Sequence, residues 1–378
     1  MSKKSSQHPR QFINSEIITF TILTYGSHGL GVHDPESDID ALCVDPFFAT
    51  IAEDFFIVLR NILKSRPGIS EIHCVKDSKF PLMRFKFDGI SVDLPYAQLK
   101  VLYVPENVDV LSLSLLNNID ETSWKSLSGV RANQRILLLV PNLKSFQSML
   151  RCLKLWAKRR GVYGRLNGFL GGVHLAILAA FVCQKQPDAS VIALISNFFS
   201  IHAMWPWPTP VILQDGMPSN VEDVIETLLH MPIRLPCTPY EYCDSNITKS
   251  TFNKIRVEFL RGHAMTRNCS YNTGSSKVKA GPLMCGEFFE PFPISTNYTR
   301  FVKIHLSALD RDGLGDWVGW VRSHFHCLLL KVTGSCALLH FGNQPGSLEE
   351  SSLLGSYNAR YTDPNQIDVL TSVWALSK

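Results

Sequence analysis

The chain has 378 residues, of which 45% are hydrophobic and 19% are charged, and its formal net charge is +4. This length and apolar content allow two or three domains with ordinary cores, and the mild positive charge does not by itself indicate a nucleic-acid partner. The ten cysteines include no Cys-x-x-Cys pair, so we expect neither a zinc site nor a disulfide framework, and no apolar run is long enough to predict a transmembrane helix.

The apolar, β-branched run from Ile17 to Ile22 predicts a first strand. It leads into Gly26-Ser27, and further glycines follow at Gly29 and Gly31. Glycine lets backbone N–H groups come close to a ligand, which suits phosphate. The sequence therefore predicts a phosphate-binding turn after the first strand.

Residues 37–44 (Ser-Asp-Ile-Asp-Ala-Leu-Cys-Val) predict a second strand. Because side chains alternate along a strand, Asp38 and Asp40 should face one side and Ile39 the other. Two carboxylates on one face repel each other unless a cation lies between them, and such oxygen ligands suit Mg²⁺ or Mn²⁺. Alone, an Asp-x-Asp pair is usually two solvated acids and a Gly-Ser pair is usually a turn. Together they indicate a phosphoryl-transfer site.

The next apolar pattern predicts a helix over residues 51–64 and strands over 69–75, 82–87 and 90–94, with a hairpin turn at Asp88-Gly89. Asp93 lies in the last of these strands, which should otherwise be buried. A charged side chain there is costly unless it is paired or binds a metal. Asp93 is therefore either an acid at a strand end or a third metal ligand.

The strongest helical pattern covers residues 144–160. Its predicted apolar face consists of Phe146, Met149, Leu150, Leu153, Leu155 and Trp156, and its predicted basic face of Arg151, Lys154, Lys158, Arg159 and Arg160. Further helices are predicted over 173–184, 190–204 and 248–261, followed by a loop over 266–282. Within the first of these, we expect His174 to be a packed helix residue rather than a catalytic base. Residues 301–306, 312–325 and 328–332 then predict a strand, a helix and a strand.

The string Tyr-Gly-Ser-x-x-Leu-Gly-Val-His, followed by Asp-Ile-Asp-Ala-Leu-Cys-Val, resembles the DNA polymerase beta-like nucleotidyltransferases, and in particular the eukaryotic poly(A) polymerases of the nuclear, plant-like type. Residues 91–97, 154–173 and 205–208 resemble further motifs of this family. The resemblance implies a multi-domain α+β fold. Its parts would be a mixed-sheet nucleotidyltransferase domain (residues 1–140), a helical central domain (141–285) and a shortened RRM-like α/β RNA-binding domain (286–378).

The resemblance also implies an activity, namely template-independent addition of AMP from ATP to RNA 3′ ends by two-metal nucleotidyl transfer. Asp38, Asp40 and Asp93 would be the catalytic residues and would bind two Mg²⁺ or Mn²⁺ ions. ATP would contact these three acids and also Tyr25, Gly26, Ser27, Lys154, Tyr163, Gly172 and Val173, and RNA would contact Lys158 and Arg159. The implied protein is a monomeric polynucleotide adenylyltransferase that does not bind membranes. It would lie in the nucleus, or alternatively the cytoplasm, and would work with cleavage and polyadenylation factors.

Three positions depart from the family pattern. Ser128 and Arg165 each stand where the family has Asn, and both bear on recognition of the base or ribose; Asp34 stands where Thr is frequent. The alternatives that stay open are an RNA uridylyltransferase, a CCA-adding enzyme or an oligoadenylate synthetase, all of which share the Gly-Ser and Asp-x-Asp core. A catalytically weak RNA-binding relative and a plain α/β binding protein are the remaining alternatives.

Overall fold

The chain forms two compact units, Met1–Leu138 and Leu139–Lys378, and each is described by itself. The computed structural model describes residues 20–35, 37–76, 80–214, 229–238, 240–243, 246–267, 283–293, 300–308, 317, 320–321, 324, 339–341, 359–363 and 366–376.

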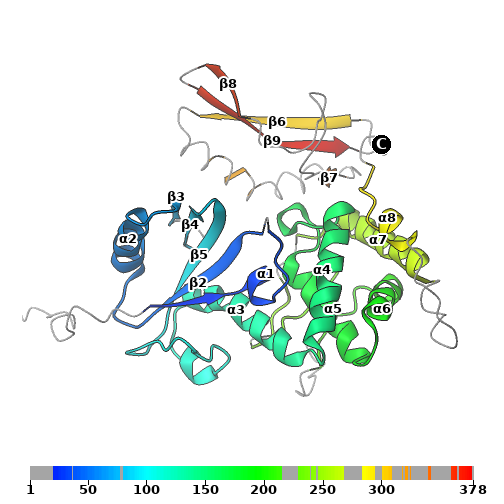
Figure 1. The fold of residues 1–378 in the computed structure, drawn as a ribbon, viewed down its shortest axis with the longest axis horizontal. Helices are drawn as coiled ribbons and strands as arrows, with labels where there is room; N and C mark the ends of the chain where they lie inside the picture. Colours follow the sequence, from blue (N-terminus) through cyan, green and yellow to red (C-terminus); the bar gives the residue numbers. More distant parts are fainter. Residues whose placement is uncertain are drawn as a thin grey trace, which may run out of the picture. The chain divides into compact units, whose positions relative to one another are not determined.

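A five-stranded sheet forms the first unit, in the order β1-β2-β5-β4-β3, drawn in blue and cyan in Figure 1. Its strands are β1 (Thr21–Thr24), β2 (Ile39–Asp45), β3 (Ile69–Val75), β4 (Leu82–Phe87) and β5 (Ile90–Gln98). β2 and β5 are parallel and the other neighbours are antiparallel, so the predicted mixed sheet is confirmed. The first strand is β1, which extends to Thr24; residues 17–19 of the predicted strand lie outside the described residues.

Side-chain alternation divides this sheet between two hydrophobic cores. Ala41 and Cys43 of β2 join one core with Phe55, which lies in the π-helical segment η2 (Ile51–Leu59) that continues into α2 (Arg60–Lys64). Leu42 and Val44 face the other way and join a second core with residues of α3 (Glu121–Leu139). The helix predicted over residues 51–64 is thus present, with a wider first part.

Helix α3 has 19 residues and was not predicted from the sequence. The reason lies in its buried side, which carries Ser123, Ser126, Arg131 and Asn133 among its apolar residues. Polar residues on the buried face hide the apolar periodicity by which a helix is recognised. Two shorter helical turns complete the unit, α1 (Gly26–Gly29) and η3 (Leu113–Leu116).

The second unit begins with helices. They are α4 (Leu143–Arg159), the short turn η4 (Arg165–Asn167), α5 (Gly172–Lys185), α6 (Val191–Met204), α7 (Lys249–Thr266) and α8 (Leu283–Phe288). Trp156 of α4 packs against Phe198 and Phe199 of α6 and Phe259 of α7, with ring centroids 4.8 to 6.5 Å apart. This aromatic cluster joins three helices that are distant in sequence. Among the described residues, no helix is long and apolar enough to cross a membrane.

The two faces predicted for the α4 helix need correction. Leu155, assigned to the apolar face, is 44% exposed, whereas Lys154 and Arg160, assigned to the basic face, are 8% and 5% exposed. Arg160 lies one residue beyond the last turn of α4 and is buried in an ion pair. The solvent-exposed basic residues at the end of α4 are therefore Lys158 and Arg159.

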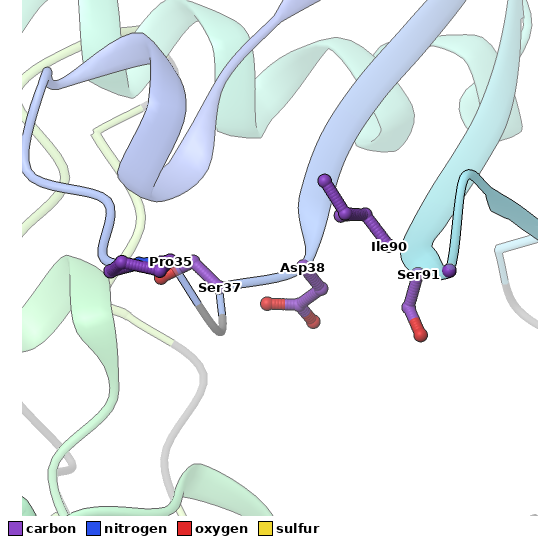
Figure 2. Close-up of a pocket in the computed structure, with 6 residues that line it drawn as sticks. Pro35, Ser37, Asp38, Ile90 and Ser91 are labelled. Carbon is purple, nitrogen blue, oxygen red and sulfur yellow. The ribbon is translucent and has the colours of Figure 1, made fainter.

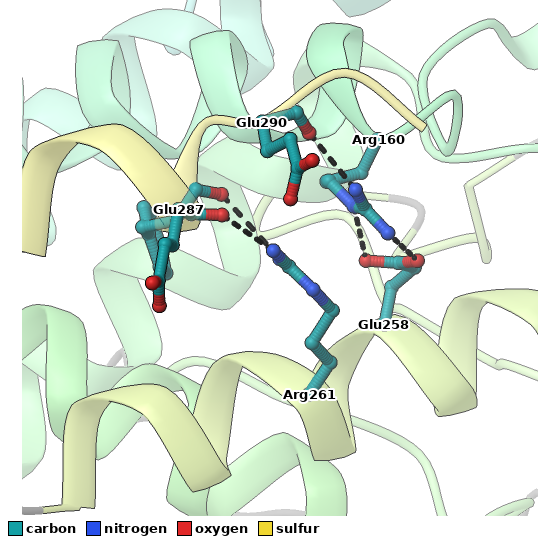
Figure 3. Close-up of polar contacts among 6 residues, drawn as sticks. Arg160, Glu258, Arg261, Glu287 and Glu290 are labelled. Carbon is teal, nitrogen blue, oxygen red and sulfur yellow. Dashed lines mark hydrogen bonds and ion pairs between the residues drawn. The ribbon is translucent and has the colours of Figure 1, made fainter. Parts of the chain in front are cut away.

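The buried ion pair joins Arg160 to Glu258 of α7 (Figure 3). Nε and Nη2 of Arg160 donate to the two carboxylate oxygens at 2.8 and 2.9 Å, and Nη1 donates to the backbone oxygen of Glu290 at 2.9 Å. Nearby, Arg261 donates to the backbone oxygen of Glu287. Arg261 thus contacts the end of α8, and Arg160 contacts the segment that follows it.

The described strands between residues 300 and 376 pair in antiparallel fashion. β6 (Arg300–Ala308) pairs with β9 (Gln366–Leu376), which also pairs with β7 (Leu339–Phe341) and β8 (Ala359–Asp363). β6 confirms the strand predicted over residues 301–306. Of the helix predicted over 312–325, residues 317, 320, 321 and 324 are described, and they are helical; the strand predicted over 328–332 lies outside the described residues. The predicted helix 248–261 continues to Thr266, and residues 268–282 of the predicted loop are likewise not among those described.

Candidate active site

Three carboxylates gather at one end of the first sheet. Asp40 on β2 is the direct partner of Asp93 on the parallel strand β5. Partners in neighbouring strands present their side chains to the same face, so these two carboxylates lie side by side. Asp38 comes two residues before Asp40, just ahead of β2, and shares its side of the strand. The structure therefore brings together the three acids singled out in the sequence.

The pKa of the Tyr25 hydroxyl is affected by the negative charge of these three acids. Burial raises the pKa of its hydroxyl well above the usual range, and the carboxylates of Asp40, Asp93 and Asp38 raise the pKa further. A hydroxyl with such a pKa stays protonated at neutral pH. Tyr25 is therefore a neutral hydrogen-bond donor beside three acids.

The backbone of Gly26 lies directly against Asp40. Gly26 has a φ of +59°, and a Cβ atom built there would stand 1.9 Å from the Oδ2 atom of Asp40. Its carbonyl accepts a hydrogen bond of 3.0 Å from the Nδ2 atom of Asn133 on α3. Gly26 and the half-buried Ser27 open the single helical turn α1, which takes the place of the predicted Gly-Ser turn. The close approach that required glycine is thus made to a carboxylate of the site.

The space in front of Asp38 is a hollow of about 410 Å³, whose lining includes Ser37, Asp38 and Ser91. Figure 2 shows the side chains of Asp38 and Ser91 pointing into the same open region from the starts of β2 and β5. The loop before β2 is closed by Asp34 and Ser37, because each backbone N–H bonds to the other residue, at 3.0 Å in both cases. Asp34 therefore shapes the loop that leads into Asp38.

Arg84 on β4 holds the third acid. Its Nε and Nη2 atoms donate to the two carboxylate oxygens of Asp93, at 2.6 and 2.8 Å. Oxygen donors of this kind fit a hard divalent cation, and strand register places Asp40 beside Asp93. Within the described part of the chain, no three His, Cys, Asp or Glu side chains already stand in a metal-binding arrangement. Asp93 is instead engaged by Arg84.

In the second unit, residues singled out as nucleotide contacts meet where α5 begins. Tyr163 forms a parallel bridge with Leu170, and a Cβ atom built on Gly172 would lie 3.4 Å from the Tyr163 hydroxyl. Gly172 and the next residue, Val173, are half-buried and begin α5. The N–H of Gly171 donates to Nδ1 of the buried His174 at 2.9 Å, which fixes the start of the helix. His174 is accordingly a packed helix residue with a capping contact.

The remaining residues singled out in the sequence lie on α3 of the first unit and on α4 and η4 of the second. Lys154 is buried in the middle of α4, whereas Lys158 and Arg159 are exposed at its end. Ser128 lies on α3, where its hydroxyl donates to the backbone oxygen of Lys125 at 2.6 Å. Arg165 is exposed in η4. Ser128 thus satisfies its hydroxyl within its own helix.

Sequence reasoning missed two residues of the site, Arg84 and Asn133. The signal for Arg84 was present, because a two-residue Asp88-Gly89 turn pairs Phe87 with Ile90 and so places Arg84 opposite Asp93. Asn133 had no comparable signal, since it lies on the helix that the apolar pattern did not reveal.

Comparison with known proteins gives two family matches. The poly(A) polymerase nucleotidyltransferase domain matches residues 3–140, and the poly(A) polymerase central domain matches residues 145–278. Nuclear poly(A) polymerase 3 of Arabidopsis thaliana is 61% identical over 313 residues, which cover 82% of this chain and 59% of that protein. The poly(A) polymerase of Dictyostelium discoideum is 36% identical over 365 residues, which cover 91% of this chain and 44% of that protein. The chain thus spans about half the length of the curated relatives it matches.

Among solved structures, one that addresses the activity of a cytoplasmic RNA terminal U-transferase aligns with a TM-score of 0.50 and 16% identity, covering 72% of this chain and 86% of that one. At this identity the likeness concerns the fold alone. The two domain matches follow one another along the chain and name the same family, and the residues they cover include the three acids and the start of α5. The chain belongs to the poly(A) polymerase family of nucleotidyltransferases.

Proposed function

We propose that this chain is a polynucleotide adenylyltransferase, which transfers AMP from ATP to the 3′ hydroxyl of RNA without a template. The observation that carries the proposal is the pairing of Asp40 with Asp93 on parallel strands, with Asp38 two residues before Asp40. Carboxylates placed in this way suit nucleotidyl transfer, where catalysis depends on positioning and on compensation of charge.

Divalent metal ions are general to this family, and in this proposal Asp38 and Asp40 hold two of them, Mg²⁺ or Mn²⁺, with Asp93 as the third ligand. When bound, the ions lower the pKa of the attacking hydroxyl and compensate the charge of the leaving pyrophosphate. The protein's own residues orient the reactants. Tyr25, whose hydroxyl pKa is raised by burial and by the three acids, would offer a neutral hydroxyl beside the acidic cluster.

The other substrate contacts are proposed from the sequence motifs, each within its own unit. Gly26 and Ser27 would contact the triphosphate, and so would Lys154 and Tyr163. Gly172 and Val173 would contact the nucleotide at the start of α5, where the orphan N–H groups of a 14-residue helix favour anions. Lys158 and Arg159 are exposed and would contact the RNA backbone.

The same reading extends to the rest of the protein. We propose the division at residues 1–140, 141–285 and 286–378, with the strands β6 to β9 belonging to an RRM-like RNA-binding domain. We also propose a nuclear location, which is supported by two relatives that are named nuclear poly(A) polymerases. A role as a monomer beside cleavage and polyadenylation factors is part of the same proposal.

Primer extension tests the activity. The purified chain is given a short oligo(A) RNA, Mg²⁺ or Mn²⁺, and ATP, UTP, CTP or GTP separately, with Asp40→Asn as the inactive variant. Glu106→Gln is the matched control, because Glu106 is an exposed acid of the same unit outside the cluster. We expect extension with ATP, loss of at least about a thousandfold in Asp40→Asn, and normal activity in the control.

Two results would contradict the proposal in different ways. Extension with UTP in place of ATP would make the chain an RNA uridylyltransferase and would assign the departures at Ser128 and Arg165 to base choice. If a folded chain that still binds RNA extends the primer with none of the nucleotides, the proposed enzymatic activity is wrong and the chain is an RNA-binding relative.

A further inference from the structure

The ion pair between Arg84 and Asp93 has an unusual place among the ion pairs of the first unit. Both oxygens of a carboxylate in the candidate metal site accept hydrogen bonds from one guanidinium, at 2.6 and 2.8 Å. Such a two-pronged contact fixes the orientation of a carboxylate as well as its charge. The side chain of Asp93 is 25% exposed and that of Arg84 is 52% exposed, so solvent and ions can reach the pair.

The position of Arg84 is set by the backbone of the sheet. β4 and β5 form a hairpin in which Arg84 is the direct partner of Asp93, and β5 in turn pairs Asp93 with Asp40. Partners across neighbouring strands lie on the same face, so the guanidinium and the two carboxylates form one row across three strands. Strand register therefore places Arg84 opposite Asp93.

The next basic residue on the same face of β4, Lys86, forms an ion pair with a different acid. Lys86 lies two residues along β4 from Arg84, opposite Ser91, and pairs with Glu71 of β3 at 2.9 Å. The two cations on one face of β4 thus have separate partners. Lys86 offers a matched control, since it has the same charge on the same strand and pairs outside the cluster.

We propose that Arg84 is a positioning residue for Asp93, holding this carboxylate in place on the face it shares with Asp40 and competing with the divalent cation for its oxygens. The inference deepens the proposed function, because it takes Asp93 as a metal ligand. Before the cation binds, the guanidinium compensates one of three neighbouring negative charges. When the cation binds, it must share or take over the oxygens that Arg84 holds.

Cation binding tests the competition without any catalysis. The Mn²⁺ affinity of the whole chain is measured by electron paramagnetic resonance, with no nucleotide present, for the wild type, Arg84→Met, Arg84→Lys and Lys86→Met. An exposed ion pair contributes little, so we expect Arg84→Met to bind Mn²⁺ more tightly by roughly two- to fivefold. Arg84→Lys keeps the charge and should stay close to the wild type. Weaker binding in Arg84→Met, or an equal gain in Lys86→Met, would overturn the competition.

Steady-state kinetics test the positioning. We expect Arg84→Met to lower kcat by about tenfold while the KM for ATP stays within about twofold, because a displaced catalytic group affects the chemical step. Arg84→Lys should not restore kcat, since an ammonium is a point charge without a planar fork. Full activity in Arg84→Lys would overturn the positioning role. Circular dichroism confirms folding, and Arg84→Gln replaces Arg84→Met if the latter unfolds.

The design separates this inference from the proposed function. If the wild type extends no primer, the proposed function fails, while the order of Mn²⁺ affinities still decides whether Arg84 competes for Asp93. If the wild type extends RNA and the Arg84 variants match it in both kcat and Mn²⁺ affinity, the inference alone fails.

Discussion

At the scale of single residues, Gly26 is the tightest point of the candidate site. Its φ of +59° disfavours any side chain, and a Cβ atom would stand 1.9 Å from one oxygen of Asp40 and 2.8 Å from its Cγ atom. The Gly26→Ala change must therefore displace the carboxylate or the turn that carries it. A displacement of about 1 Å at a catalytic group costs about a hundredfold in rate, so we expect that loss of kcat in primer extension.

Gly89→Ala is the matched control for this prediction. Gly89 also lines the hollow in front of Asp38 and has a φ of +84°, so alanine there suffers the same kind of backbone strain, but a Cβ atom would meet no atom within 4 Å and so would not touch Asp40. We expect both variants to lose roughly 1 kcal/mol of stability from the strain, while Gly89→Ala keeps primer extension within a few-fold of the wild type. An equal loss of activity in both variants would assign the effect to strain and not to contact with Asp40.

The individual residues of the site differ in how far the sequence predicts their positions. Asp38 and Asp40 could be placed on one side because strand alternation is a local rule, and Asp93 stood out as a charge in a buried strand. Arg84 required combining the hairpin turn with the register of β4 and β5, which is a second, longer-range step. The contact of Asn133 with Gly26 joins residues 107 positions apart and has no local signal.

At the scale of elements, the ion pair between Arg160 and Glu258 ties the end of α4 to α7. Their side chains are 7% and 3% exposed, so neither charge can be solvated if the other is removed. Breaking a buried pair by removing one partner costs about 3 to 5 kcal/mol. We expect Glu258→Gln to lower the free energy of unfolding by about that amount, measured by urea denaturation followed by circular dichroism.

Two comparisons make this prediction decisive. The double variant Arg160→Met with Glu258→Leu should lose less stability than Glu258→Gln alone, because it leaves neither partner of the pair as an uncompensated ion. Glu71→Gln removes one partner of the exposed pair with Lys86 and should cost less than about 1 kcal/mol. A small effect of Glu258→Gln, equal to that of Glu71→Gln, would show that Arg160 finds another partner or reaches solvent.

Elements differed in how well the sequence predicted them. Helices α5 and α6 were predicted within one or two residues of their ends, because each is apolar and bounded by a clear signal, such as the Ser190 cap or the prolines after Trp205. In α4, the apolar periodicity predicted the helix but not which of its charged side chains are buried. Arg160 is buried with Glu258 of α7 as its partner, and such a tertiary partner leaves no trace in the spacing of one helix.

At the scale of the whole molecule, the charge is nearly balanced, with 37 basic and 33 acidic residues. RNA affinity must then come from local groups of basic residues and not from the overall field. Lys158 and Arg159 are one such group, exposed at the end of α4. Each contact to a single-stranded phosphate contributes about 0.7 to the slope of log affinity against log salt. The double variant Lys158→Gln with Arg159→Gln should therefore reduce the slope by roughly 1.4, as two contacts require.

The measurement is fluorescence anisotropy with labelled oligo(A) over a series of salt concentrations. Its control is the double variant Lys64→Gln with Arg66→Gln, which removes the same charge from two exposed residues of the first unit. A smaller slope in the first variant and an unchanged slope in the control would place phosphate contacts at the end of α4. An equal reduction in both would mean that net charge alone sets the affinity, and an unchanged slope in the first would exclude Lys158 and Arg159 from the RNA path. The comparison works because a local contact releases its own counterions, whereas a distant charge of equal size does not.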